Sequence, residues 1–126
     1  MADFTLAIEV DPGHPEAHTG LGYVRACQKQ FADAQLEALK ALLRREKRPQ
    51  LNDYMIFHNV ACIHAEIALA DPGQTLLQQD QALTVLHRAV ESWRVRPAIP
   101  SEIELMGQEA SFKPFSSRPE FRDMMK

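Results

Sequence analysis

Residues 15–45 read PEAHTGLGYVRACQKQFADAQLEALKALLRR, and the spacing of their apolar side chains decides the fold class. Apolar residues recur here at intervals of three, four and seven, which is the period of α-helices and not the alternation of β-strands. One helix of this length would span about 45 Å, and the apolar stripe changes phase near Gln30 and Phe31. The stretch therefore predicts two helices joined by a tight turn.

The helical pattern continues through the second half of the chain. Apolar spacing predicts a third helix over about residues 53–69 and a fourth over 75–93, separated by the helix breakers of residues 71–73. Thr75 and Gln78 have the spacing of a capping box, in which each side chain accepts a backbone N–H of the other residue. We therefore expect the fourth helix to be capped by Thr75.

The last quarter of the chain predicts a cap over the helices. Ser101 and Glu104 repeat the capping-box spacing and predict a short fifth helix after Pro100. Phenylalanine and methionine then recur among the prolines of residues 112–126. That is enough apolar surface for the tail to fold back over an exposed helix face.

Length and composition bound the function. The 126 residues suffice for one domain, and 45% hydrophobic with 25% charged residues is typical of a globular chain. A formal charge of −3 gives no electrostatic reason to bind nucleic acid or an anionic membrane. Cys27 and Cys62 lie in apolar-periodic stretches without CxxC spacing, so we expect buried, reduced thiols. The amino terminus has no signal-peptide pattern, and we expect a cytoplasmic location.

The chain also repeats itself. Ala7 and Ala41 each start an apolar-rich pair, and the interval between them matches the period of a helical-hairpin repeat. At longer intervals Leu21-Gly22 recurs as Val60-Ala61, and the alanine pair Ala34 and Ala41 recurs as Ala82 and Ala89. The extra residues of the second copy fall in its predicted loops, where insertions cost least.

With these residues the chain resembles the tetratricopeptide repeat family, whose units are helical hairpins of about 34 residues. The resemblance rests on small and apolar residues at the family's positions, namely Pro15-Glu16-Ala17, Leu21-Gly22, Phe31, Ala34 and Ala41-Leu42 in one copy, and Phe57, Val60-Ala61, Ala82 and Ala89-Val90 in the next. It implies an all-α fold in which antiparallel helix hairpins stack into a short right-handed superhelix. The small residues are then notches that let neighbouring helices approach closely.

The resemblance also divides the single domain of residues 1–126. It implies the end of a partial repeat at 4–12, a first full repeat at 15–45, a second repeat with insertions at 53–93 and a capping segment at 101–126. The chain departs from the family where His18 replaces a common tryptophan, and where Arg25 and His64 replace aromatic residues.

The family's concave surface implies a non-enzymatic scaffold that binds a peptide or partner helix. The side chains expected there are Thr19, Tyr23, Ala26 and Cys27 from the first full repeat, and Met55, His58, Cys62 and Glu66 from the second. Tyr23 and Met55 are the predicted anchors, because aromatic and methionine side chains offer adaptable apolar contact. Only Asn59 resembles the carboxylate-binding set of the family's chaperone-tail binders, so we expect weak or absent binding to acidic tails.

Three alternatives accompany this interpretation. In the first alternative, several of the groove side chains contact the terminal segment of the chain and not a partner. The partial repeat leaves Phe4 and Ile8 uncovered and supports a homodimer. In addition, the segment Asn59-Val60-Ala61-Cys62, followed by the long turn and the ending Arg118-Pro119-Glu120-Phe121, resembles terminal repeats of bacterial multidomain proteins, including some serine/threonine kinases. This resemblance implies a self-associating regulatory segment.

Chemistry receives little support from the sequence. Neither a GxxxxGK[ST] loop nor a GxGxxG turn after a strand is present, and the acidic residues are scattered, so we expect no enzyme and no cofactor. His58 and Cys62 lie four apart and would share one helix face, which leaves a metal or redox protein as an alternative. A structural zinc site needs four ligands, so packing is the preferred interpretation and no metal site is predicted.

Overall fold

The computed structural model describes residues 15–47 and 53–126, and every regular element in these ranges is helical. The long helices are α2 (Pro15–Cys27), α3 (Phe31–Lys47), α4 (Asp53–Ala70) and α5 (Thr75–Val95). A 3₁₀-helix, η1 (Pro72–Gln74), precedes α5, and α6 (Glu102–Gln108), 3₁₀-helix η2 (Ala110–Phe115) and α7 (Pro119–Met124) complete the chain. The predicted all-α class is confirmed. The predicted partial repeat at 4–12, with Phe4 and Ile8, lies outside the described residues.

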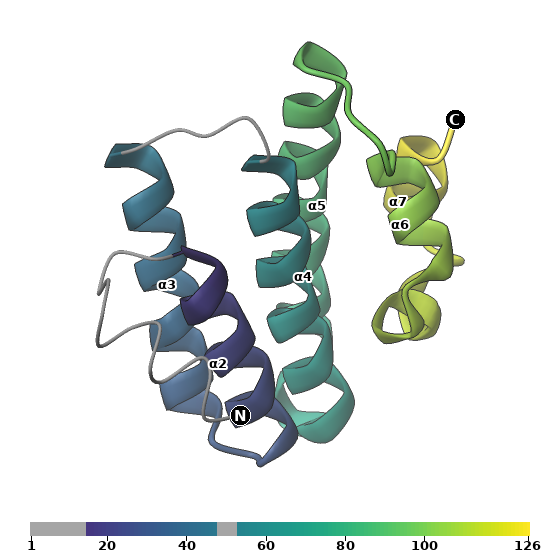
Figure 1. The fold of residues 1–126 in the computed structure, drawn as a ribbon. Coiled ribbons are helices and arrows are strands. Elements are labelled where there is room, and N and C mark those ends of the chain that lie inside the picture. Colours follow the sequence, from purple (N-terminus) through teal and green to yellow (C-terminus); the bar gives the residue numbers. More distant parts are fainter. Residues whose placement is uncertain (1–14, 48–52) are drawn as a thin grey trace.

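The long helices form two hairpins that lie side by side. α2 packs on α3, α4 packs on α5, and α4 also contacts both helices of the first hairpin (Figure 1). The predicted turn after the first helix lies at residues 28–30, where Lys29 has a φ of 62° that ends the helix. No helix within the described ranges has the length and apolar character needed to cross a membrane.

Helix α4 is the centre of the core. Its side chains are buried on nearly every face, which is typical of a helix surrounded by others. The notch residues Ala34, Ala41, Ala61, Ala82 and Ala89 belong to the same core and have no exposed surface. Gly22 on α2 is tightly packed as well, because a Cβ there would lie 2.7 Å from Cδ1 of Ile63. The predicted role of small residues in close helix packing is confirmed.

The C-terminal segment packs against α4 and α5 (Figure 1). Ser101 caps α6 by accepting the Glu104 N–H at 3.0 Å. Phe112, Phe115 and Phe121 form a buried cluster with ring centroids 5.7 to 6.2 Å apart. These rings supply the apolar surface that holds so short a segment in place.

The predicted capping box at Thr75 is wrong. Gln74 is the N-cap of α5 and makes no side-chain cap bond, whereas the Thr75 hydroxyl donates to the Ala68 carbonyl at 2.9 Å. Gln78 accepts instead from His64 Nδ1 at 2.7 Å. The reason is that Asp71 caps η1, which runs directly into α5 and displaces the start of the helical run.

Candidate functional site

A groove with a volume of about 580 Å³ opens between α2 and α4. It is lined by Thr19, Gly20, Tyr23 and Val24 from α2, by Met55, Asn59 and Cys62 from α4, and by Glu109 from the segment after α6. On each helix these positions are one residue, one turn or two turns apart, which places them on a single face. The two faces oppose each other because the notch at Gly22 brings α2 against α4.

Four of the eight predicted groove residues line this space, namely Thr19, Tyr23, Met55 and Cys62. Two others on α2 do not line it, because Ala26 is fully buried in the core and Cys27 is exposed beyond the lining. Burial and the charge of Glu66 raise the pKa of Tyr23 to about 12, so its phenol stays protonated and is able to donate a hydrogen bond.

The other two, His58 and Glu66, contact the C-terminal segment. The Ser111 hydroxyl donates to Glu66 Oε1 at 2.7 Å. The ring of Phe112 lies edge-on to His58 with a centroid separation of 5.2 Å. For these two side chains the structure shows the alternative considered from the sequence, in which the tail covers part of the expected surface.

Sequence reasoning missed Gly20, Val24 and Glu109 as lining residues, and it considered Asn59 only for its likeness to the carboxylate-binding set. The first two adjoin Thr19 and Tyr23 on the same helical face, so a full helical projection finds them. A helical projection does not find Glu109, because this residue follows α6 and lies outside the predicted repeats. Its position depends on how the tail folds back, which the repeat pattern does not encode.

His58 lies between two carboxylates at the end of the groove. Its Nδ1 is 2.7 Å from Glu102 Oε1, and its Nε2 is 3.5 Å from Glu109 Oε2. Burial opposes the charged imidazolium, but the hydrogen bonds and charges of Glu102 and then Glu109 outweigh it and raise the pKa of His58. Glu102 is fully buried, burial raises its pKa, and its Oε2 has no hydrogen-bond partner among the described residues.

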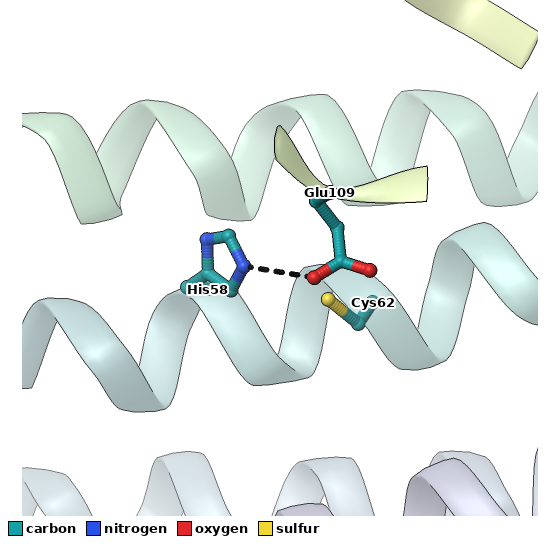
Figure 2. A group of neighbouring side chains, drawn as sticks. All are labelled: His58, Cys62 and Glu109. Atoms are coloured by element: carbon teal, nitrogen blue, oxygen red, sulfur yellow. Dashed lines mark ion pairs between the residues drawn. The ribbon is translucent and has the colours of Figure 1, made fainter. Parts of the chain in front are cut away.

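Cys62 lies one helical turn from His58, with its sulfur beside the Glu109 carboxylate (Figure 2). Burial, followed by the charge of Glu109, raises the pKa of the Cys62 thiol. A nucleophilic cysteine needs the opposite, a lowered pKa in an electropositive setting. Cys62, His58 and Glu102 thus have the residue types of a nucleophile, a base and an orienting acid. The raised pKa of the thiol nevertheless opposes thiolate formation.

A second hollow, with a volume of about 750 Å³, lies between α5 and α7. Charged side chains of both signs line much of it, including Arg88, Glu91, Arg94 and Asp123. Arg88 is already engaged, because its guanidinium lies 4.5 Å from the centre of the Phe57 ring. We regard this hollow as a solvated surface between the tail and α5.

Comparisons with protein-family models, with curated proteins and with solved structures find no match to this chain.

Proposed function

We propose that this chain is a non-enzymatic protein-interaction module of the tetratricopeptide type, which binds a peptide or partner helix in the groove between α2 and α4. The observation that carries the proposal is the groove itself, an open space between the first helices of two successive hairpins. The helix contacts support stacking of successive hairpins, because α4 packs against α2 and α3 of the first hairpin as well as against α5 of its own.

The lining of the groove indicates the chemistry of the partner. Tyr23 is 39% exposed and Met55 is partly buried, so both retain surface for an apolar side chain of a partner. Asn59 offers amide hydrogen bonds to a peptide backbone. The lining contains no lysine or arginine within the described residues, and its one carboxylate is Glu109. These features favour an apolar peptide with a neighbouring basic residue.

Selection from a random-peptide display library on the full chain tests the proposal. Selected peptides are synthesised, and their dissociation constants are measured with the wild type and with the double variant Tyr23→Ala, Met55→Ala. We expect at least about a tenfold loss of affinity, because removing two central apolar anchors costs more than about 1.4 kcal/mol.

The matched control is the double variant Leu36→Ala, Leu39→Ala. These leucines are 48% and 53% exposed on α3, which contributes no side chain to the groove. We expect this control to bind like the wild type. Equal affinities of the Tyr23→Ala, Met55→Ala variant and the wild type would show that the groove is not the binding surface.

A further inference from the structure

Three different donor atoms meet at the end of the groove. His58 and Cys62 share one face of α4, and Glu109 reaches them from the N-cap of η2 (Figure 2). The ligand atoms of these three residues all lie within 4.8 Å of one another. One nitrogen, one sulfur and one oxygen thus lie around a common position, and the first two belong to the buried central helix α4.

The orientation of His58 suits a ligand. Its Nδ1 contacts Glu102 Oε1 at 2.7 Å, so with a proton on Nδ1 the ring donates to Glu102 and leaves the Nε2 lone pair facing Glu109. A carboxylate that orients the ring in this way accompanies most metal-binding histidines. Glu102 has no exposed surface, so solvent does not compete for this bond.

The distance between His58 Nε2 and Glu109 Oε2 fits two ligands of one metal ion better than it fits a direct ion pair. A strong ion pair between imidazolium and carboxylate has a separation of about 2.7 to 2.9 Å, whereas His58 Nε2 and Glu109 Oε2 are 3.5 Å apart. Two ligands of a tetrahedral ion at metal–ligand distances of about 2.0 to 2.1 Å are separated by about 3.4 Å. The Cys62 sulfur lies within 4.8 Å of both of these atoms, and a zinc–sulfur distance of about 2.3 Å is compatible with all three joining one ion after a small adjustment.

We propose that His58 Nε2, Cys62 Sγ and Glu109 bind a divalent transition-metal ion, with Zn²⁺ as the best-matched species. Mixed sulfur, nitrogen and oxygen donors suit zinc, whereas magnesium and calcium prefer oxygen alone. Binding forms bonds from the ion to the thiolate and to the lone pair of His58 Nε2, and it releases to solvent the thiol proton and, from the imidazolium form, the Nε2 proton. The thiolate and the Glu109 carboxylate together balance the two positive charges.

The site lies at the groove and is accessible from it, because Cys62 and Glu109 are both lining residues. A fourth ligand therefore comes from the groove, as solvent or as a donor atom of a bound peptide. An open fourth position of this kind distinguishes the site from a closed structural zinc site. The inference goes beyond peptide binding and does not depend on it.

Titration of the metal-free full chain with Co²⁺ tests the proposal, since cobalt reports sulfur ligation through a thiolate-to-metal charge-transfer band. We expect one Co²⁺ per chain, with this band, and its displacement by Zn²⁺. The variant Cys62→Ala should lose the band, and Glu109→Gln should bind at least about tenfold more weakly. Cys27→Ala is the matched control and should retain both the band and the affinity, because Cys27 lies outside the cluster.

Circular dichroism of each variant establishes that it is folded before titration. Glu109→Gln addresses the site even if Cys62→Ala disturbs the core, because the Glu109 side chain is 31% exposed. The proposal is overturned if the folded wild type binds no Co²⁺ at millimolar concentration. It is equally overturned if the charge-transfer band survives in Cys62→Ala or disappears in Cys27→Ala.

Discussion

At the residue scale, glycine has two different roles in this chain. Gly22 is buried where α2 meets α3 and α4, and a Cβ there would lie 2.7 Å from Ile63 Cδ1 and 3.3 Å from the Ala34 carbonyl oxygen. Gly107 is exposed on α6, and a Cβ there would meet only Met125 Cε at 3.4 Å. The first glycine is required by close packing, whereas the second only lowers helix propensity.

Substituting each glycine by alanine separates these roles. In Gly22→Ala, overpacking costs about 1 to 3 kcal/mol and outweighs the helix-propensity gain of up to about 1 kcal/mol, so we expect a net loss of stability. In Gly107→Ala we expect a gain of about 0.5 to 1 kcal/mol. Urea unfolding followed by the fluorescence of Trp93 measures both. A similar gain in both variants would show that α2 and α4 do not approach closely.

The polar side chains of His18 and His64 each have a partner on the neighbouring helix of their hairpin. His18 Nδ1 is 2.5 Å from Glu37 Oε2 across α2 and α3, and His64 Nδ1 is 2.7 Å from Gln78 Oε1 across α4 and α5. The sequence identified the departures but not the partners, because pairing across helices depends on their relative rotation.

The pairing of His64 predicts a pH effect on stability. Burial lowers the pKa of His64 below its ordinary value, against the opposing hydrogen bond to Gln78. The unfolded chain therefore takes up a proton first, so stability is full above about pH 6.5 and falls as the pH drops toward the lower folded pKa.

Unfolding free energies at pH 7.5 and 5.5, compared between the wild type and His64→Gln, measure this effect. We expect the wild type to lose more stability on acidification than the variant. The contribution of His58 is present in both proteins and cancels in the comparison. Equal losses would contradict the assignment of a neutral, buried His64.

At the element scale, the C-terminal segment is bound mainly by its aromatic residues. Phe112 is fully buried and contacts His58, Phe115 and Phe121. Arg118 adds an ion pair to Asp80 on α5 at 2.8 Å, but such exposed pairs contribute little. The tail therefore depends on apolar burial, which also places Glu109 beside His58.

Truncating Phe112 tests this dependence. We expect Phe112→Ala to lower the unfolding free energy by about 3 to 5 kcal/mol, because a large buried ring leaves a cavity. The neighbouring Lys113→Ala, at an exposed position, should change it by less than about 0.5 kcal/mol. Chemical denaturation measures both variants. A change below about 1 kcal/mol in Phe112→Ala would show that the tail is not packed on α4.

The elements were largely predictable from the sequence, and their ends less so. Apolar periodicity placed the long helices because each buries a continuous stripe. The start of α5 was wrong because two local hydrogen-bonding options competed at Asp71 and Thr75, and only the folded loop shows which one forms. Glu109 could not be placed at all, because a fold-back segment positions it.

At the scale of the whole molecule, the groove is the feature that joins fold and proposed function. Its α2 and α4 faces follow from helical spacing, so half of the predicted site residues line it. The others were misplaced because the repeat pattern gives neither the depth of Ala26 nor the covering of His58 and Glu66 by the tail. The repeat pattern thus predicts where the groove surface lies, and the C-terminal segment determines how much of that surface stays exposed.

The charge of the groove lining predicts which peptides bind. Glu109 lines the groove, Glu66 lies close enough to Tyr23 to raise its pKa, and the described lining has no basic side chain. For the metal-free chain we expect peptides that end in acidic residues and a free carboxylate to bind at least about tenfold more weakly than matched peptides carrying lysine, because like charges repel. Fluorescence anisotropy at low and high salt measures this difference. Tighter binding of the acidic peptides would overturn the proposed partner chemistry.

The groove depends on the close packing of α2 against α4 at Gly22. The most direct measurement is a nuclear Overhauser effect between the Gly22 Hα protons and the δ1 methyl of Ile63 in a selectively methyl-labelled protein. We expect a strong cross-peak, because Ile63 Cδ1 lies 2.7 Å from the position that a Gly22 Cβ would occupy. Absence of this cross-peak, with both resonances assigned and sharp, would show that α2 and α4 do not meet at Gly22.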